Sequence, residues 1–254
     1  MQLRLRQICL VAGNLDPVVD ALCWVFGLAV CHVDDAVAEY GLVNALMPVG
    51  SQFLEVVAPT GPGTAAGRYL ERRGGDGGYM VITQCDDLDR RRRRVDELGV
   101  RVANRLSYGQ FQGMQLHPKD TGGTFFEIDR QEDGDSGDGA WHPAGPDWRP
   151  YVRTGVVSAI TAAEIQSPDP DALAARWSEI AQIPLTRDAA GMATLPLANA
   201  DLRFVVASDG RGEGLAGLDL AAEDADAAIA SARTRGFLQE GNVIRVAGMR
   251  FALV

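Results

Sequence analysis

A single carboxylate, Glu127, stands within a short apolar run of the kind that forms a β-strand. The run 124–128 is β-branched and aromatic, and residues 117–123 (HPKDTGG) supply the proline, polar side chains and glycines of a tight turn. In a strand, Phe125, Glu127 and Asp129 share one face. An acid in apolar surroundings needs a metal ion, a proton that it can move, or a cation as its partner. The alternative is an acid at a strand end that reaches water.

The sequence of this hairpin, HPKDTGGTFFEID, resembles that of the last hairpin of a module in the vicinal oxygen chelate superfamily. That superfamily includes glyoxalase I, bleomycin-resistance proteins, extradiol dioxygenases and methylmalonyl-CoA epimerase, and the hairpin is most similar to the epimerases. The final glutamate of the hairpin is a metal ligand in the superfamily, and Glu127 matches it.

The composition is typical of a globular protein with a large core. The chain has 254 residues, 46% of them apolar and 23% charged. A formal net charge of −10 argues against binding to nucleic acid or to an anionic membrane. No apolar run is long enough to span a bilayer, and the four cysteines lack a C-x-x-C spacing. We therefore expect a cytoplasmic protein whose partners are a small-molecule ligand and, at most, a second copy of the chain in a homodimer.

The predicted elements repeat four times in the order β-α-β-β-β, and such a repeat governs the prediction of the fold. The first repeat is a strand, a helix and three further strands, predicted over residues 3–12, 16–26, 28–33, 41–47 and 52–57. The acidic, glycine- and proline-rich stretch 131–150 has the composition of a linker. The resemblance thus implies an α+β fold of four βαβββ modules forming two tandem glyoxalase-like open barrels. Residues 1–130 would form the first barrel, with the site, and residues 151–254 a degenerate second one.

The resemblance also implies four inward ligands, one on each of four strands. These positions carry Gln7, Glu55, Met80 and Glu127, so both histidines of the superfamily pattern are missing. A thioether suits hard divalent ions poorly, whereas carboxylate and amide oxygens suit them well. We expect Gln7, Glu55 and Glu127 to be the ligands of any ion, which would be weakly held Mg²⁺ or Mn²⁺ rather than Zn²⁺ or Ni²⁺. The alternatives are a dry pocket filled by Met80, or a protonated Glu55–Glu127 pair that moves protons without an ion.

Three further side chains are candidates for substrate contacts, beside Met80. Asn44 occupies the position of the catalytic glutamate of the epimerases. An amide cannot act as a general base, so we expect Asn44 to donate a hydrogen bond to a substrate carbonyl or enolate. Arg68 precedes the glycine-rich loop 74–78, which could close over the cavity around an anionic substrate; the alternative is a surface connection. His117, at the turn, is a candidate acid or ligand.

Two kinds of function fit these residues. In the first, Glu127 and Glu55 are catalytic groups of an isomerase or lyase that moves a proton next to a carbonyl, with a divalent metal as Lewis acid. Its substrate would be a small oxygen-bearing molecule, a carbonyl compound or a carboxylate. In the second, the chain is a metal-free binding or sequestration protein of the bleomycin-resistance type. The missing histidines favour the second function, and the two retained carboxylates favour the first.

Overall fold

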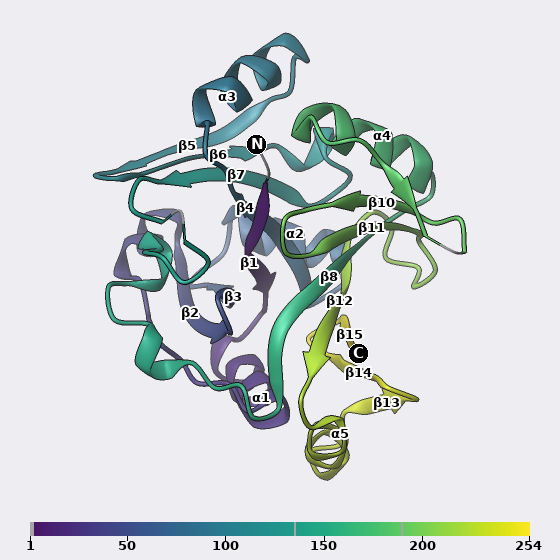
Figure 1. The fold of residues 1–254 in the computed structure, drawn as a ribbon. Coiled ribbons are helices and arrows are strands. Elements are labelled where there is room, and N and C mark those ends of the chain that lie inside the picture. Colours follow the sequence, from purple (N-terminus) through teal and green to yellow (C-terminus); the bar gives the residue numbers. More distant parts are fainter. Residues whose placement is uncertain (1–2, 135, 189) are drawn as a thin grey trace. The chain divides into compact units, whose positions relative to one another are not determined.

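The computed structural model describes residues 3–134, 136–188 and 190–254 (Figure 1). The elements of the first half of the chain are β1 (Arg4–Val11), α1 (Leu15–Phe26), β2 (Leu42–Val49), β3 (Gln52–Pro59), α2 (Ala65–Arg73), β4 (Gly77–Gln84), α3 (Leu88–Glu97), β5 (Val102–Tyr108), β6 (Phe111–Leu116) and β7 (Phe125–Gln131). Those of the second half are β8 (Val157–Ser167), α4 (Pro170–Ala181), β9 (Thr186–Arg187), β10 (Ala193–Pro196), β11 (Asp201–Val206), β12 (Gly214–Ala222), α5 (Ala225–Thr234), β13 (Leu238–Glu240), β14 (Val243–Val246) and β15 (Met249–Leu253).

The predicted α+β class and its repeated module are confirmed. The groups β4–α3–β5–β6–β7, β8–α4–β9–β10–β11 and β12–α5–β13–β14–β15 each consist of a strand, a helix and three strands. The first module departs from this order, because the predicted strand over residues 28–33 is wrong. Only His32 forms an isolated bridge there, to Leu46. The ladder stops because the side-chain oxygen of Asn44, and not a backbone carbonyl, accepts the hydrogen bond from the backbone N–H of Asp34.

The strands form two sheets. One has seven strands in the order β2-β3-β1-β4-β7-β6-β5, and the other has eight in the order β13-β14-β15-β12-β8-β11-β10-β9. The strands pair in parallel where a module's first strand meets its last strand, as in β4–β7, β8–β11 and β12–β15. Hairpin partners within a module pair antiparallel. This is the pattern that a βαβββ module requires, since a helix must separate parallel neighbours.

The chain divides into two compact units, each made of three stretches. The first unit comprises Met1–Gln7, Tyr79–His142 and Ala162–Leu215, and the second comprises Ile8–Gly78, Pro143–Thr161 and Ala216–Val254. The first unit therefore joins the second module to the third, and the second unit joins the first module to the fourth. The sequence analysis predicted a domain boundary at residues 131–150, between the first and the second pair of modules along the chain. That division into 1–130 and 151–254 stays a prediction.

In the first unit, α3 and α4 pack against each other and Trp177 of α4 lies in the core. Its ring stacks on Phe126 of β7, with centroids 4.2 Å apart, and meets Phe204 of β11 edge-on. Its indole N–H donates to the carbonyl of Thr121 at 3.2 Å. The buried nitrogen is thus satisfied, as a core tryptophan requires.

In the second unit, α1 covers one face of β2 and β3 and also packs against α5. The sulfur atoms of Cys23 in α1 and Met47 in β2 are 3.6 Å apart, which identifies the covered face of the sheet. Phe26 at the end of α1 contacts Phe251 of β15, with ring centroids 4.9 Å apart. The second unit thus has its own apolar core.

After Gln131, which ends β7, the described residues of the stretch predicted as a linker contain only short 3-10 turns, at His142–Ala144 and Arg149–Tyr151. Two of its side chains, Trp141 and Trp148, are nevertheless buried. Trp148 meets Phe53 edge-on within the second unit, with centroids 5.0 Å apart. A stretch with the composition of a linker therefore contributes to the cores of the units.

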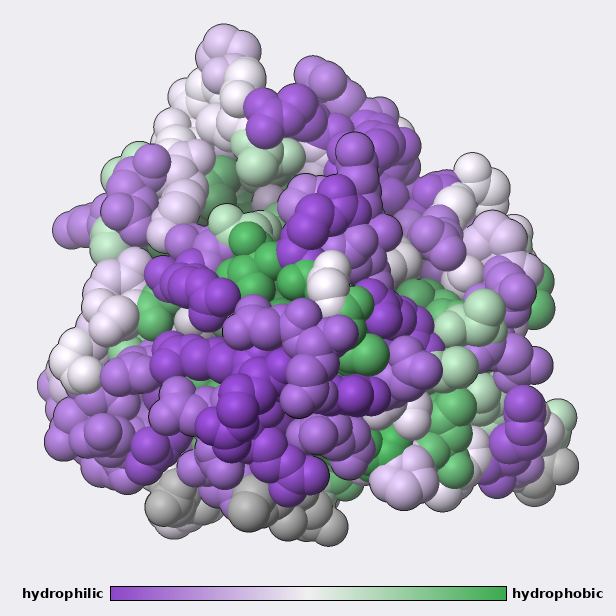
Figure 2. Space-filling model, turned by 90° about the horizontal axis from the view of Figure 1, so that it is seen from above, coloured by the Kyte–Doolittle hydropathy of each residue, from purple (hydrophilic) through white to green (hydrophobic). Residues whose placement is uncertain are grey.

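Hydrophilic residues predominate on the face of the molecule that Figure 2 shows, and hydrophobic ones lie in small groups between them. This agrees with a chain in which 23% of the residues are charged and the formal net charge is −10. Within the described residues, no helix has both the length and the apolar character needed to cross a bilayer.

Candidate functional site

Glu127 lies on β7 in the first unit, and Asp129 is its neighbour on the same face. The side chains are 3% and 0% exposed, respectively. Among the described residues, no donor outside this pair reaches either carboxyl oxygen of Asp129. Burial, followed by the charge of the adjacent Glu127 and hydrogen bonding with it, raises the pKa of Asp129 well above its ordinary value and favours its protonated form. The face on which the sequence placed both Glu127 and Asp129 thus holds a buried carboxyl pair.

Gly113 of β6 makes room for this pair. It lies opposite Asp129 in the antiparallel register of β6 and β7, and a Cβ atom at position 113 would clash with Asp129 Oδ1. The absence of a side chain at Gly113 is therefore what allows the carboxyl group to lie against the neighbouring strand.

Replacing Gly113 by alanine is expected to destabilise the chain by about 1–3 kcal/mol, because the added methyl group overpacks the site of Asp129. The Asp129→Ala change should remove most of this cost, since it removes the clashing oxygen. Urea unfolding of the parent, the two single variants and the double variant would measure the coupling. An equal cost of Gly113→Ala in both backgrounds would contradict this placement of the carboxyl group.

Met80 lies on the same side of the sheet as Glu127. In the parallel register of β4 and β7, Met80 is opposite Phe125 and Ile82 is opposite Glu127, so these side chains share one face. Met80 is partly exposed. The ring of Tyr79 packs edge-on against that of Phe125, with centroids 5.1 Å apart.

Gln7 is buried in the first unit and is held by Trp141. The indole N–H donates to Gln7 Oε1 at 2.8 Å. The Trp141 ring meets Phe111 edge-on, with centroids 5.4 Å apart. Phe111 shares its face of β6 with Gly113, which lies opposite Asp129. Trp141 therefore covers the face of the sheet that carries Glu127.

Trp141 belongs to a segment, residues 131–134 and 136–142, that we call the covering segment. Other residues of this segment also form hydrogen bonds and ring contacts with the first unit. The Gln84 amide donates to the carbonyl of Gly134 at 2.8 Å, and the His142 ring stacks on Phe111. Arg6 donates to the carbonyls of Gly137 and Gly139. The sequence analysis did not predict that this segment covers the face of the sheet that carries Glu127. A tryptophan in an otherwise polar, glycine-rich stretch was nevertheless a signal of burial.

Glu55 and Asn44 are neighbours in the second unit, on β3 and β2. The Asn44 amide donates to Glu55 Oε1 at 2.7 Å, and its oxygen accepts from the N–H of Asp34 at 2.9 Å. Both side chains are buried. Asn44 therefore positions the Glu55 carboxylate and keeps it hydrogen-bonded, in a place where a carboxylate without partners would be costly.

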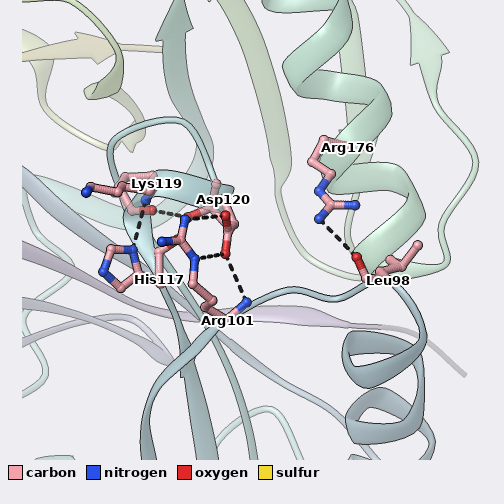
Figure 3. A network of polar contacts seen from close by, with 8 residues as sticks. Leu98, Arg101, His117, Lys119, Asp120 and Arg176 are labelled. Carbon is pink, nitrogen blue, oxygen red and sulfur yellow. Dashed lines mark hydrogen bonds and ion pairs between the residues drawn. The ribbon is translucent and has the colours of Figure 1, made fainter.

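The other two candidates are Arg68, in a short helix, and His117, at a turn. Arg68, in α2 of the second unit, is exposed and donates to the carbonyl of Gly63 at 2.7 Å, so it ties down its own loop. His117 begins the 3-10 turn Pro118–Asp120 in the first unit, and its Nδ1 accepts from the N–H of Lys119 at 3.1 Å (Figure 3). Their roles toward a substrate stay predictions.

Beside His117, Asp120 forms a two-point ion pair with Arg101. The distances are 2.6 Å from Arg101 Nη2 to Asp120 Oδ1 and 2.8 Å from Nε to Oδ2 (Figure 3). Hydrogen bonding from Arg101 lowers the pKa of Asp120 to about 2. This pair fixes the turn that leads into β7.

The side-chain oxygens at the predicted ligand positions, with the partners that they have in this structure, do not fit a tightly held divalent ion. Gln7 Oε1 accepts from Trp141, Glu55 Oε1 accepts from Asn44, and Glu127 lies beside the carboxyl group of Asp129, whose pKa is raised. Within the described part of the chain, no group of three or more His, Cys, Asp or Glu side chains is arranged to hold a metal. That Gln7, Glu55, Met80 and Glu127 converge on one cavity stays a prediction.

Comparison with known proteins identifies the class. Residues 4–128 match the model of the Glyoxalase/Bleomycin resistance protein/Dioxygenase superfamily, and this part of the chain belongs to the superfamily. The resemblance to the vicinal oxygen chelate superfamily, predicted from the sequence of the 117–129 hairpin, is therefore confirmed. No curated protein matches the sequence significantly.

Solved structures extend the likeness to the whole chain. A hypothetical protein from Staphylococcus aureus has a TM-score of 0.68 at 12% identity, with 100% of this chain and 99% of that one covered. A mutant of 4-hydroxymandelate synthase from Streptomyces coelicolor has a TM-score of 0.70 at 14% identity, covering 93% of this chain and 76% of that one. At these identities the likeness concerns the fold, and it confirms the tandem glyoxalase-like modules.

A variant of the Streptomyces coelicolor methylmalonyl-CoA epimerase in complex with 2-nitronate-propionyl-CoA is similar over a shorter stretch. Its TM-score is 0.46 at 23% identity, with 52% of this chain and 99% of that chain covered.

Proposed function

We propose that the chain binds a small oxygen-bearing molecule, a carbonyl compound or a carboxylate, without depending on a tightly held metal ion. The observation that carries this proposal is the hydrogen bond from Trp141 to Gln7 Oε1. This bond uses the amide oxygen at the first ligand position for the internal packing of the first unit. The ligand of such a protein is recognised by hydrogen bonds and shape, as in binding proteins of the superfamily's bleomycin-resistance branch.

The polar groups available for recognition are of the kind that binds oxygen. The Asn44 amide nitrogen carries two protons, and one of them is used by Glu55. The raised pKa of Asp129 favours its protonated form, whose single O–H could be donated to a ligand oxygen only in place of Glu127. The expected partners are therefore this ligand and, at most, a second copy of the chain. Size-exclusion chromatography with light scattering would detect such a homodimer.

The test is a comparison of ligand binding with and without metal. The purified chain is analysed for bound metals, treated with EDTA and titrated calorimetrically with a panel of 2-oxo acids and hydroxyketones. The titrations are repeated in excess Mg²⁺ or Mn²⁺. We expect the same affinity in both conditions. Isolation of the protein with stoichiometric Zn²⁺, or binding that requires an added ion, would overturn the proposal.

Met80→His restores an imidazole at a position where the superfamily has one, and it lies on the face that carries Glu127. We expect the variant to bind Zn²⁺ or Ni²⁺ about tenfold more tightly than the parent, since imidazole is a strong donor for these ions and thioether is not. Val206→His, at an exposed position of β11 in the same unit, controls for a histidine that lies elsewhere on the surface. Equal gains in both variants would argue against the assignment of Met80 to the site.

A second candidate function is proton transfer of the isomerase or lyase type, with weakly held Mg²⁺ or Mn²⁺. It is favoured by Glu127, which matches the ligand glutamate of the superfamily, and by the carboxylate of Glu55. Asn44 stands where the epimerases have a catalytic base, so a two-base epimerisation is the least suitable reaction of this type. Exchange of the α-protons of a bound oxo acid with deuterium, followed by NMR with and without Mg²⁺, would distinguish catalysis from binding.

A further inference from the structure

The second unit contains a cavity of about 530 Å³ at the start of α1. Its lining comes from the first turn of α1, the segment that follows this helix, and strands β2 and β3. Its lining residues are Gly13, Asn14, Leu15, Asp16, Val19, Val30, Val33, Val43, Asn44, Ala45, Ala58 and Pro59. The volume is within the range of small-molecule sites.

The cavity lies on the face of the sheet opposite to the Asn44–Glu55 pair. In the antiparallel register of β2 and β3, Val43 is opposite Ala58 and Asn44 is opposite Val57. Side chains alternate between faces, so Val43, Ala45 and Ala58 point to the face that α1 covers, whereas Asn44 points to the other face with Glu55. The cavity therefore lies on the opposite face of β2 from the Glu55 carboxylate, although Asn44 also borders it.

Most of the lining is apolar and partly open to solvent. Eight of the twelve lining residues are leucine, valine, alanine or proline. Val33 and Val43, which face the cavity, are 57% and 42% exposed, more than most valines. Removing these surfaces from water favours an apolar occupant, at about 25 cal/mol for each Å² that is covered.

The polar end of the cavity is negatively charged. Asp16, in the first turn of α1, lines it and is exposed. The carboxylate of Asp76 adjoins it, because its Oδ1 accepts from the N–H of Gly13 at 2.8 Å. None of the twelve lining residues, all within the described chain, is a lysine or an arginine. The helix dipole supplies only about half a positive charge here, which two carboxylates outweigh.

We propose that this cavity binds an apolar molecule that carries one ammonium group. The apolar body lies against Val33, Val43 and Ala45, and the ammonium group lies at the mouth beside Asp16. An acidic rim around an apolar cavity selects this class of ligand over a fatty acid, since a carboxylate would be repelled by Asp16 and Asp76.

The test uses three probes with the same apolar body, namely phenylbutylamine, phenylbutyrate and phenylbutanol. Each is titrated into the full chain at neutral pH and followed by amide NMR shifts of the lining residues. We expect the amine to bind most tightly, the alcohol more weakly and the carboxylate weakest. Asp16→Asn should weaken binding of the amine about two- to fivefold and leave the alcohol unchanged. Asp20→Asn, one helical turn further along α1 and outside the lining, is the matched control and should change neither.

Val43→Trp should weaken binding of all three probes about tenfold or more, because the larger side chain fills the cavity. Val43 is partly exposed, so this variant is expected to fold, and circular dichroism checks that it does. The proposal is overturned if no probe shifts the lining residues, if the carboxylate binds as tightly as the amine, or if Asp16→Asn and Asp20→Asn have equal effects.

Discussion

Replacing Trp177 by alanine is expected to lower the free energy of unfolding by about 3–5 kcal/mol, the usual cost of removing a fully buried aromatic side chain. The Trp177 ring is 0% exposed, stacks on Phe126 and contacts Phe204, and its N–H bonds to the carbonyl of Thr121. The change leaves a large cavity and an unsatisfied carbonyl in the core of the first unit. Urea unfolding followed by circular dichroism would measure it.

Trp24→Ala is the matched control, because Trp24 lies on α1 with 54% of its surface exposed. Its main contact is the guanidinium of Arg235, 4.4 Å from the ring centroid, so we expect a loss of only about 0.5–1 kcal/mol. If the two tryptophan variants lost equal stability, the packing of Trp177 against Phe126 would be wrong.

The Trp177 contact also bears on how the modules are paired. Trp177 belongs to the third module and Phe126 to the second, and both lie in the first unit. In a chain cut after residue 150, Phe126 would lose this partner and expose apolar surface. The fragment is therefore expected to be less soluble than the full chain, although its length would suffice for one barrel.

The fold was predictable where the signal is local. The alternation of apolar and polar residues in β7 correctly placed Glu127 and Asp129 on one face, and register places Met80 on that face too. The strand predicted over residues 28–33 failed because a side chain, that of Asn44, competes with the backbone for the N–H of Asp34. Composition alone contains no information on such a competition.

The site was less predictable, because burial depends on contacts between distant parts of the chain. Trp141 bonds to Gln7, which is 134 positions away in the sequence. The surrounding stretch has the composition of a linker, and nothing in its own pattern indicates which strand it covers. Likewise, alternation shows that Glu127 and Asp129 share a face but does not show that Gly113 leaves space for both carboxyl groups.

Asp129→Asn is expected to change how the stability of the chain depends on pH. Burial and the neighbouring Glu127 raise the pKa of Asp129 in the folded state, so the folded chain keeps a proton that the unfolded chain releases above about pH 3.9. The stability that this proton provides is complete below the unfolded pKa and is lost as pH rises toward the folded pKa. Within this window the parent should lose up to about 1.4 kcal/mol per pH unit from this one proton.

The asparagine variant cannot ionise at position 129, and its amide can still donate to the Glu127 carboxylate. Its stability relative to the parent should therefore increase from pH 5 to pH 8, as measured by urea unfolding at each pH. Asp120→Asn is the matched control with the opposite sign. The pKa of Asp120 is lowered to about 2, so its ion pair with Arg101 is lost only as pH falls toward that value. The contribution of the Arg101–Asp120 ion pair should therefore be constant between pH 5 and pH 8. Parallel curves for Asp129→Asn and the parent over the same range would show that the carboxyl pair does not hold the proton assigned to it.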